Sequence, residues 1–427
     1  MLKLRPAIVI ETRRTGEKAD AEIPAGERPG AAGEQRLVVE LTTDSEPAHP
    51  GKRREAIADV GLVGRTEVGD EVIVNVQALD LGLGSGGFDV VHVNLTRGLD
   101  GGGDSGPARP HVMKLNYTSL QHAVEPVERE LLQLPVERPV AVLALHGQLA
   151  SLAWAFAQAA PGATLGYVQT EGGALPGGHS HTVRTLRERG LLAGHLTAGA
   201  AFGGDAEAIT TAGALHHGLR VLGWDAAVCG PGPGIVGSSS PLGHGGMIAL
   251  DSAHVSLALE CSTLLVARMS SGDERKRHRG ISHHTLTVLD LLLEPVTVAL
   301  PAGMRSPVGT DLRAGLSAVF GGAMPSRPAA DRPALAVDVA RPARLARHDW
   351  RRASVDLPAY AASGLPADTM GRGLTGDPLF FGAALAGGSV LAELVSHSST
   401  GRNGGEDRSG EGRGGEGRGG EDASDAP

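Results

Sequence analysis

The sequence predicts an α/β protein, in which a small N-terminal β-barrel-like domain precedes a Rossmann-like open α/β/α sandwich and a disordered C-terminal tail follows it. Three observations support this prediction. Short runs rich in Val and Ile occur throughout residues 1–105, and strand and helix patterns alternate from Arg138 onward. Residues 396–427 repeat Gly-Gly-Glu and Gly-Arg units and lack the apolar side chains that a core requires.

Residues 1–105 are expected to form the small β domain. Turn residues separate its short strand candidates, and a Gly-Asp turn at residues 69–70 precedes one of them, as in OB-like or SH3-like barrels. The strand candidates are Ala7–Thr12, Arg36–Leu41, Glu71–Val76 and Phe88–Asn94. The glycine-rich stretch Gly101–Pro110 is expected to link this domain to the next one.

Residues 111–395 are expected to form the sandwich, because parallel strands covered by helices on both faces read as short, continuous apolar runs. The strand candidates are Pro139–Leu145, Thr164–Thr170, His195–Gly199, Asp225–Gly230, Thr263–Met269 and Val296–Leu300. The helix candidates are Gln148–Ala160, Thr182–Arg189, Asp205–Leu222, Met247–Leu259, His283–Leu293 and Asp377–Val395.

The composition restricts the class of protein and its partners. A 41% apolar and 20% charged chain is typical of a soluble globular protein, and no window of 18 consecutive apolar residues predicts a membrane span. A net charge of −9 and 3% aromatic residues argue against a nucleic-acid partner. The N-terminus lacks a signal-peptide pattern, and Cys229 and Cys261 are too few for a disulfide framework, so we expect a cytoplasmic location.

Glycine, hydroxyl and charged residues follow several predicted strands. Ligands of open parallel sheets bind beyond the carboxyl ends of the strands, so these residues predict a ligand site at one edge. The third strand is followed by Gly203, Gly204 and Asp205, and the fourth by a glycine-rich loop. The fifth is followed by the basic and histidine-rich segment Asp273–His284.

The loop after the fourth strand contains Gly232, Gly234, Gly237 and Ser238. Its glycines allow backbone N–H groups to approach an anion closely, which predicts a phosphate or carboxylate cradle, although a purely structural loop explains the composition equally well. The glycines also match GxGxxG formally. That motif should open a helix in the first βαβ unit, whereas Pro241 and other residues intervene here, so a dinucleotide site is disfavoured.

The basic segment suggests both anion binding and acid/base chemistry. Ser282 is a plausible N-cap for a helix that begins at His283, and a helix N-terminus next to Arg277 and Arg279 would bind a phosphate or carboxylate. A solvated basic loop is the alternative. If the segment is catalytic, His278 and His283, together with Asp205, are the expected acid/base groups.

A metal site is not expected from the histidine spacing. His278, His283 and His284 form a His-x4-His-His pattern, which is no established ligand spacing, and adjacent residues of a helix point about 100° apart. The purified protein should therefore carry less than stoichiometric zinc or manganese. Cys229 at the end of the fourth strand is expected to be a buried small residue rather than a nucleophile.

Five strings occur together in the chain, namely GRTEVGDEVIVNVQALDLGLGSGGFDVV, HVMKLNYTSLQ, CGPGPGIVGSSSPLG, HRGISHHTLTVL and TMGRGLTGDPLFFGAALAGG. From about residue 1 to 395 the chain resembles an uncharacterised bacterial family, domain of unknown function 3866, found mainly in actinobacteria. The loop of that family reads nearer to GPGIVGTGT, so Ser238-Ser239-Ser240 departs from it. The resemblance implies a bacterial origin and supports the domain limits, but it implies no activity.

Two functional hypotheses follow. The first is an enzyme acting on a small phosphorylated or carboxylated metabolite bound at the C-terminal edge of the sheet. The second is a non-catalytic metabolite-sensing or protein-interaction module. The sequence indicates no particular cofactor and no oligomeric state.

Overall fold

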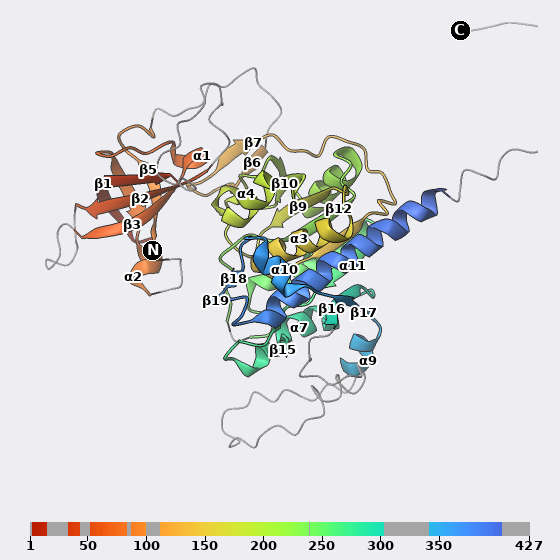
Figure 1. Cartoon of the computed structure of the whole chain (residues 1–427). Helices are drawn as coiled ribbons and strands as arrows, with labels where there is room; N and C mark the ends of the chain where they lie inside the picture. Colours follow the sequence, from red (N-terminus) through yellow and green to blue (C-terminus); the bar gives the residue numbers. More distant parts are fainter. Residues whose placement is uncertain are drawn as a thin grey trace, which may run out of the picture.

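A computed structural model describes residues 2–14, 33–42, 52–82, 87–99, 112–238, 240–302 and 341–403. These residues form a closed β-barrel near the N-terminus and a larger unit built on a parallel sheet with helices, as Figure 1 shows. The prediction of a barrel followed by an α/β unit is therefore confirmed. The expected linker Gly101–Pro110 and residues 404–427 of the expected tail lie outside the described residues. Residues 396–403, which were also assigned to the disordered tail, instead continue the C-terminal helix to Asn403.

The barrel consists of β1 (Leu4–Arg14), β2 (Glu34–Leu41), β3 (Arg53–Asp59), β4 (Glu71–Asn75) and β5 (Asp89–Asn94). The strands close in the order β1-β2-β3-β5-β4, with β3 and β5 parallel, and the short helices α1 (Val60–Val63) and α2 (Gln77–Asp80) flank β4. The sequence predicted four of the strands but not β3. The apolar pattern typical of a strand is interrupted in β3 by Arg54. This side chain is nevertheless buried, and it donates to the carboxylates of Asp80, at 2.7 Å, and Asp89, at 2.9 Å.

A hairpin of β6 (Val112–Lys114) and β7 (His122–Val124) packs on the larger unit. The side chain of Lys114 is buried there, where its Nζ donates to the Thr197 carbonyl at 3.2 Å and pairs with Glu207 at 2.7 Å. This buried ion pair fixes the hairpin to the sheet edge that Glu207 belongs to.

The large sheet has the strand order β11-β10-β9-β12-β8-β13-β16-β17, and all its pairs are parallel. Its strands are β8 (Pro139–Val142), β9 (Leu165–Thr170), β10 (Gly194–Ala198), β11 (Ala206–Ala208), β12 (Ala226–Pro231), β13 (Ser262–Val266), β16 (Thr297–Ala302) and β17 (Asp349–Ser354). All six predicted strands are present. The two edge strands β11 and β17 were not predicted, because their sequences AEA and DWRRAS contain no apolar run.

Helices cover both faces of this sheet and form two separate cores. One face carries α3 (Leu149–Ala159), α4 (His181–Glu188), α10 (Leu357–Ala362) and α11 (Pro378–Asn403). The other face carries α5 (Thr211–His216), α6 (Ile248–Ala258), α7 (His283–Leu291) and α9 (Arg341–Ala346).

The predicted helix Asp205–Leu222 is wrong over its first turns. Helix α5 begins only after Thr210, whose side chain accepts from the N–H of Gly213, and it continues as a π-helical turn, His217–Val221. The carboxylate of Asp205 accepts from the N–H of His195 at 2.9 Å, so it supports the entry to β11 instead of capping a helix.

Helix α11 is long and apolar enough to cross a membrane by length and composition, but most of its apolar window is buried inside the protein. It packs against α3 and the sheet, and a Cβ atom added at Gly388 would lie 2.2 Å from the carbonyl oxygen of Leu152. The two helix backbones therefore approach closely, as in the core of a sandwich.

The chain leaves the centre of the sheet in two directions. From β8 it passes through α3 to β9 on one side, and from β12 it passes through α6 to β13 on the other side. Because α3 and α6 lie on opposite faces, a crevice opens beyond the carboxyl ends of β12, β8 and β13.

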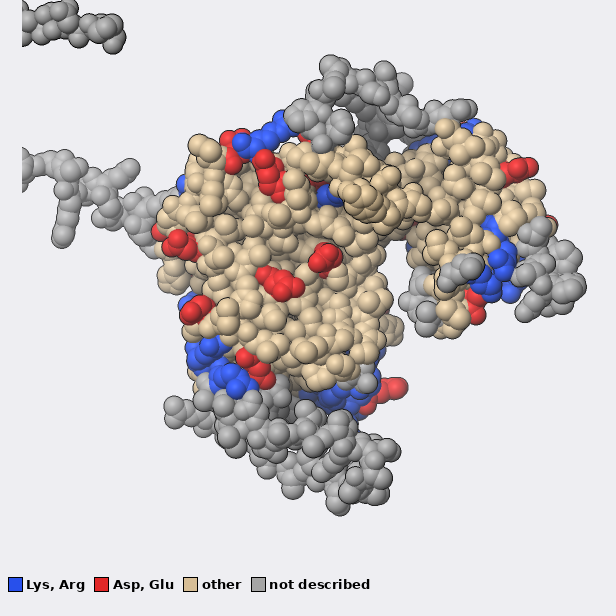
Figure 2. All heavy atoms as spheres, turned by 180° about the vertical axis from the view of Figure 1, so that it is seen from behind, with Lys and Arg blue, Asp and Glu red and all other residues tan. Residues whose placement is uncertain are grey.

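Charged side chains are scattered over the face of the molecule seen in Figure 2. Among the described residues on that face, Lys and Arg form small separate groups and not a continuous stripe.

Candidate functional site

A cavity of about 720 Å³ occupies the crevice at the carboxyl ends of the central strands. Five separate stretches of the chain line it. They are Leu145–Gly147 after β8, Thr182 in α4, Pro233–Ser238 and His244 after β12, residues of the segment from Arg268 to His284 after β13, and Asp368–Met370 before α11.

The glycine-rich loop forms one wall of the cavity. Gly234, Gly237 and Ser238 line it, whereas Gly232 packs away from it against Ala174. Gly234 has a φ of 75°, a conformation that favours glycine, and a Cβ there would have room, with its nearest neighbour at 3.7 Å. The loop then folds back on itself, since Ser238 N–H donates to the Gly243 carbonyl at 2.6 Å, so it does not open a helix as the GxGxxG motif requires.

Arg268 brings a buried positive charge to the cavity. It follows β13 directly, and the residue is only 3% exposed. Its Nη1 lies 3.0 Å from His284 Nδ1 and its Nη2 lies 3.6 Å from the Asp273 carboxylate, while its Nε has no hydrogen-bond partner within the described part of the chain. Burial lowers the pKa of Arg268 to about 10, so the side chain stays charged at neutral pH.

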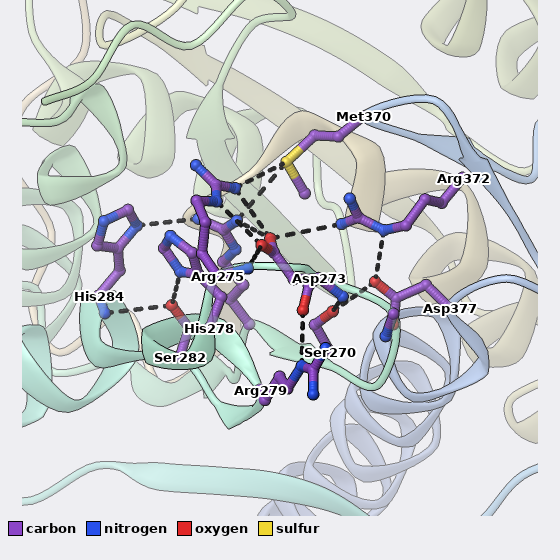
Figure 3. Close-up of polar contacts among 12 residues, drawn as sticks. Ser270, Asp273, Arg275, His278, Arg279, Ser282, His284, Met370, Arg372 and Asp377 are labelled. Atoms are coloured by element: carbon purple, nitrogen blue, oxygen red, sulfur yellow. Dashed lines mark hydrogen bonds and ion pairs between the residues drawn. The ribbon is translucent and has the colours of Figure 1, made fainter. Parts of the chain in front are cut away.

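Two carboxylates bind nearby guanidinium groups, that of Arg275 within the segment and that of Arg372 just before α11, as Figure 3 shows. Asp273 accepts two hydrogen bonds from Arg275, each 2.9 Å long, and this bidentate contact keeps the pKa of Asp273 well below its usual range. Asp377 accepts from Ser270 Oγ at 2.6 Å and from Arg372 Nε at 3.1 Å. Arg275 is therefore fixed by an ion pair, although its side chain is 48% exposed.

Four histidines meet beside Arg268. The ring centroids of His244 and His284 are 3.2 Å apart, those of His283 and His284 are 4.1 Å apart, and those of His278 and His283 are 4.9 Å apart. Burial lowers the pKa of His244 and His283 to about 4, that of His278 to about 3 and that of His284 to about 2. All four imidazoles are therefore neutral at physiological pH.

Most of the nitrogens in this cluster have no hydrogen-bond partner among the described residues. His278 Nδ1 lies 2.8 Å from Ser282 Oγ, but the Nε2 atoms of all four rings are buried and find no partner in that part of the chain. Nitrogen atoms of His278, His283 and His284 lie within 4.8 Å of one another. His283 and His284 are adjacent in the first turn of α7, and the 3₁₀ turn Lys276–His278 brings a third ring close to them, so the three rings gather although the sequence spacing did not predict it.

His146, at the end of β8, is a further neutral imidazole on the cavity wall. Burial lowers its pKa to about 4. Its Nε2 lies 2.7 Å from Ser180 Oγ and its Nδ1 lies 3.3 Å from the hydroxyl of Tyr167, which donates onward to a carbonyl at the end of β12. Both ring nitrogens of His146 therefore contact other side chains of the protein, and these contacts stabilise the cavity wall.

Several residues predicted for the site lie elsewhere. Gly203, Gly204 and Asp205 are at the β10–β11 edge and do not line the cavity, because two strands separate β10 from β8. The N–H of Gly203 donates to Glu207 at 2.7 Å, which gives this turn a structural role. Arg277 lines the cavity, whereas Arg279 donates through Nε to the Asp273 carbonyl at 2.8 Å.

The other predicted residues are close to the cavity. His278 lines it, His283 packs against His278, and Ser282 is the N-cap of α7, as predicted. His244 and Arg268 also line the cavity, although no sequence pattern predicted them. Arg268 was hidden inside the predicted strand Thr263–Met269, which ends three residues earlier than expected.

Comparisons with known proteins give one match. The model of a family described as "Protein of unknown function (DUF3866)" matches residues 55–388, which include every residue that lines the cavity. The match is shorter than the expected range of about 1–395, since it begins within β3 and ends within α11. No curated protein and no solved structure matches the chain.

Proposed function

Because the chain belongs to the DUF3866 family of proteins of unknown function, whose description supplies no activity, we propose a function from the cavity itself. The protein is an enzyme that acts on a small phosphorylated or carboxylated metabolite. The metabolite binds at the carboxyl edge of the sheet, between the glycine-rich loop and the segment after β13.

This proposal rests on the buried guanidinium group of Arg268, whose charge is only partly compensated by its neighbours. A buried charge is costly unless hydrogen bonds and an opposite charge compensate it. Asp273 compensates Arg268 only in part, because its closest approach is 3.6 Å while both of its oxygens are engaged by Arg275 at 2.9 Å. A phosphate or carboxylate in the cavity would supply the missing acceptor, and a guanidinium group matches the geometry of such anions.

The remaining walls suit a small anion. The volume of about 720 Å³ falls within the usual range for small-molecule sites. Arg277 lines the same cavity and is exposed, so it can add a second positive charge from the solvent side. Gly234 and Gly237 have no side chains and leave the backbone of the loop open to close approach by a ligand.

The imidazole groups favour an enzyme over a sensor. A sensor needs only the anion cradle, whereas here His244, His278 and His284 line the cavity beside Arg268 in their neutral form. Neutral imidazoles can accept a proton or donate a lone pair to a reacting group or an ion. Asp205 takes no part in the proposed chemistry, because its carboxylate is bound at the far edge of the sheet.

Thermal shift measurements with phosphate, sulfate, sugar phosphates, nucleotides and dicarboxylates test this proposal. A ligand at about 100 times its Kd adds roughly 2.7 kcal/mol to stability, which should raise the Tm of wild type by several degrees. Arg268→Met and Arg277→Ala should lose most of that shift. Arg129→Ala, which removes an exposed arginine outside the cavity, is the matched control and should keep it.

Arg277→Ala is included because Arg268→Met replaces a buried residue and could prevent folding. Arg277 is exposed, so its replacement should leave the fold intact. If every effective anion stabilises wild type and both cavity variants equally, the anion binds elsewhere and the proposal fails.

A further inference from the structure

We propose that His278, His283 and His284 bind a divalent transition-metal ion, with zinc as the first choice, at the side of the cavity. This inference adds a cofactor to the proposed function. It stands on the histidine geometry alone, so either proposal can fail without the other.

The unsatisfied nitrogens are the first reason. A buried polar atom without a hydrogen bond costs free energy, and native proteins contain few of them. Here the Nε2 atoms of four neighbouring rings, and also Nδ1 of His244, are buried without a partner among the residues that the structure describes. A metal ion satisfies such lone pairs together, which a single water or hydroxyl group cannot do.

The distances are the second reason. One nitrogen from each of His278, His283 and His284 lies within 4.8 Å of the other two. Tetrahedral coordination at Zn–N distances of 2.0–2.1 Å places ligand nitrogens about 3.3 Å apart. Small rotations of the three side chains therefore bring their nitrogens to coordination distance, with no movement of the backbone elements that carry them.

A hydrogen bond at Nδ1 of His278 leaves Nε2 of the same ring available as a metal ligand. Metal-binding histidines commonly donate their second ring N–H to an oxygen, which fixes the ring and leaves a lone pair on the other nitrogen. His278 Nδ1 lies 2.8 Å from Ser282 Oγ, which also accepts from the backbone N–H of His284. With Nδ1 as the donor, His278 Nε2 carries the free lone pair.

His284 connects the metal to the anion. A guanidinium group can only donate, so His284 Nδ1 accepts from Arg268 Nη1 at 3.0 Å and the proton of the neutral ring lies on Nε2. For His284 to bind the metal through Nε2, Arg268 must turn this N–H away and the ring proton must move to Nδ1. The freed N–H of Arg268 then points toward the anion in the cavity.

The donor set indicates the class of metal. Three imidazoles without a thiolate suit zinc and other late first-row ions, because Cys229 and Cys261 are buried in the sheet region and outside the cluster. Three protein ligands leave a fourth position for water or substrate. His278 and His284 line the cavity, so that position is reached from the same space as the anion.

Metal analysis of the untagged full-length chain tests the inference. We expect about one zinc ion per chain after purification, or after reconstitution of chelator-treated protein. Titration of the metal-free protein with Co²⁺ should produce visible d–d absorption typical of a tetrahedral nitrogen site. His278→Ala and His283→Ala should each weaken binding at least tenfold, whereas His181→Ala, which removes an exposed histidine outside the cluster, should leave it unchanged.

Circular dichroism identifies any variant that fails to fold, and His283→Gln then replaces His283→Ala as the milder change. Zinc binding by wild type weaker than a Kd of about 1 μM, or equal binding by wild type and both folded cluster variants, would overturn the inference.

Arg268→Met separates the two proposals. It should keep the metal and lose the anion-dependent shift, whereas His283→Ala should lose the metal. If phosphate still stabilises metal-free wild type while no metal binds, only the metal inference fails. If zinc binds at one equivalent while no anion stabilises the protein, only the proposed anion site fails.

Discussion

The Nη1 atom of Arg268 lies 3.0 Å from Nδ1 of His284, and this contact joins the two halves of the cavity. The guanidinium group belongs to the half that is proposed to bind an anion, and the imidazole belongs to the histidine cluster. Because the same N–H cannot serve both the ring and a bound anion, occupation of either half is expected to change the other.

Asp273 is predicted to stabilise the fold by balancing the charges around Arg268. Its carboxylate contacts Arg268, Arg275 and Arg372, and it is almost fully buried. Asp273→Asn should lower the free energy of unfolding by about 3–5 kcal/mol, the usual cost of leaving a buried charge uncompensated. Urea unfolding measures this change.

Asp349→Asn is the matched control for that variant, since Asp349 pairs with Arg351 at the surface and should change stability by less than about 1 kcal/mol. Equal effects of the two variants would contradict the assigned role of Asp273.

Acid is predicted to destabilise the α/β unit through His146 and His195. Burial lowers the pKa of His146 to about 4 and that of His195 to about 3, from 6.5. The unfolded chain therefore binds protons first, and the free energy of unfolding should fall as the pH drops below about 6.5, down to about 3–4. Above pH 6.5 both states are neutral, and these two residues contribute no pH dependence.

The slope of stability against pH measures this effect. Each of these histidines contributes at most about 1.4 kcal/mol per pH unit between its unfolded and folded pKa values. His195→Asn should reduce the slope between pH 6 and 4 by up to that amount relative to wild type. An unchanged slope in His195→Asn would show that His195 is already protonated in the folded protein.

The sequence predicted the central sheet well because its strands are continuous apolar runs. The prediction from sequence failed where charged side chains are buried in the core. Arg54 made β3 look like a surface segment although its side chain is buried with Asp80 and Asp89. Arg268 was read as part of an apolar strand although it is the buried charge of the cavity. In both cases the compensating carboxylate is distant in the sequence, or lies in a turn that no local pattern specifies.

The candidate site was predicted in part. The loop at Gly234–Ser238 and the segment containing Arg277 and His278 line one cavity because β8 alone separates the strands before them. Gly203 and Gly204 lie away from it because strand order, which the sequence does not state, places β10 near the sheet edge. The contact of His244 with His284 joins the loop after β12 to the first turn of α7, and no spacing rule could reveal it.

Trp224 is predicted to depend on three glycines that make room for its ring. A Cβ atom added at Gly166 would lie 1.9 Å from the indole, and atoms added at Gly194 and Gly218 would lie 2.6 and 2.4 Å from it. Gly166→Ala should therefore force the buried indole out of place, and Trp224→Ala should cost about 3–5 kcal/mol. Chemical unfolding of both variants and of the double variant measures the coupling, which should make the double variant less destabilised than the sum of the two.

Gly234→Val is predicted to damage the anion site beyond its cost in stability. The φ of 75° at this position disfavours any residue with a Cβ, which costs roughly 1–2 kcal/mol, and the new side chain would enter a loop that lines the cavity. Gly190→Val is the matched control, because Gly190 has a φ of 67°, has no atom within 4 Å of an added Cβ and lies outside the cavity. Both variants should lose similar stability in the absence of ligand. Only Gly234→Val should lose the rise in Tm with phosphate, so an equal rise in both variants would place the anion away from the loop.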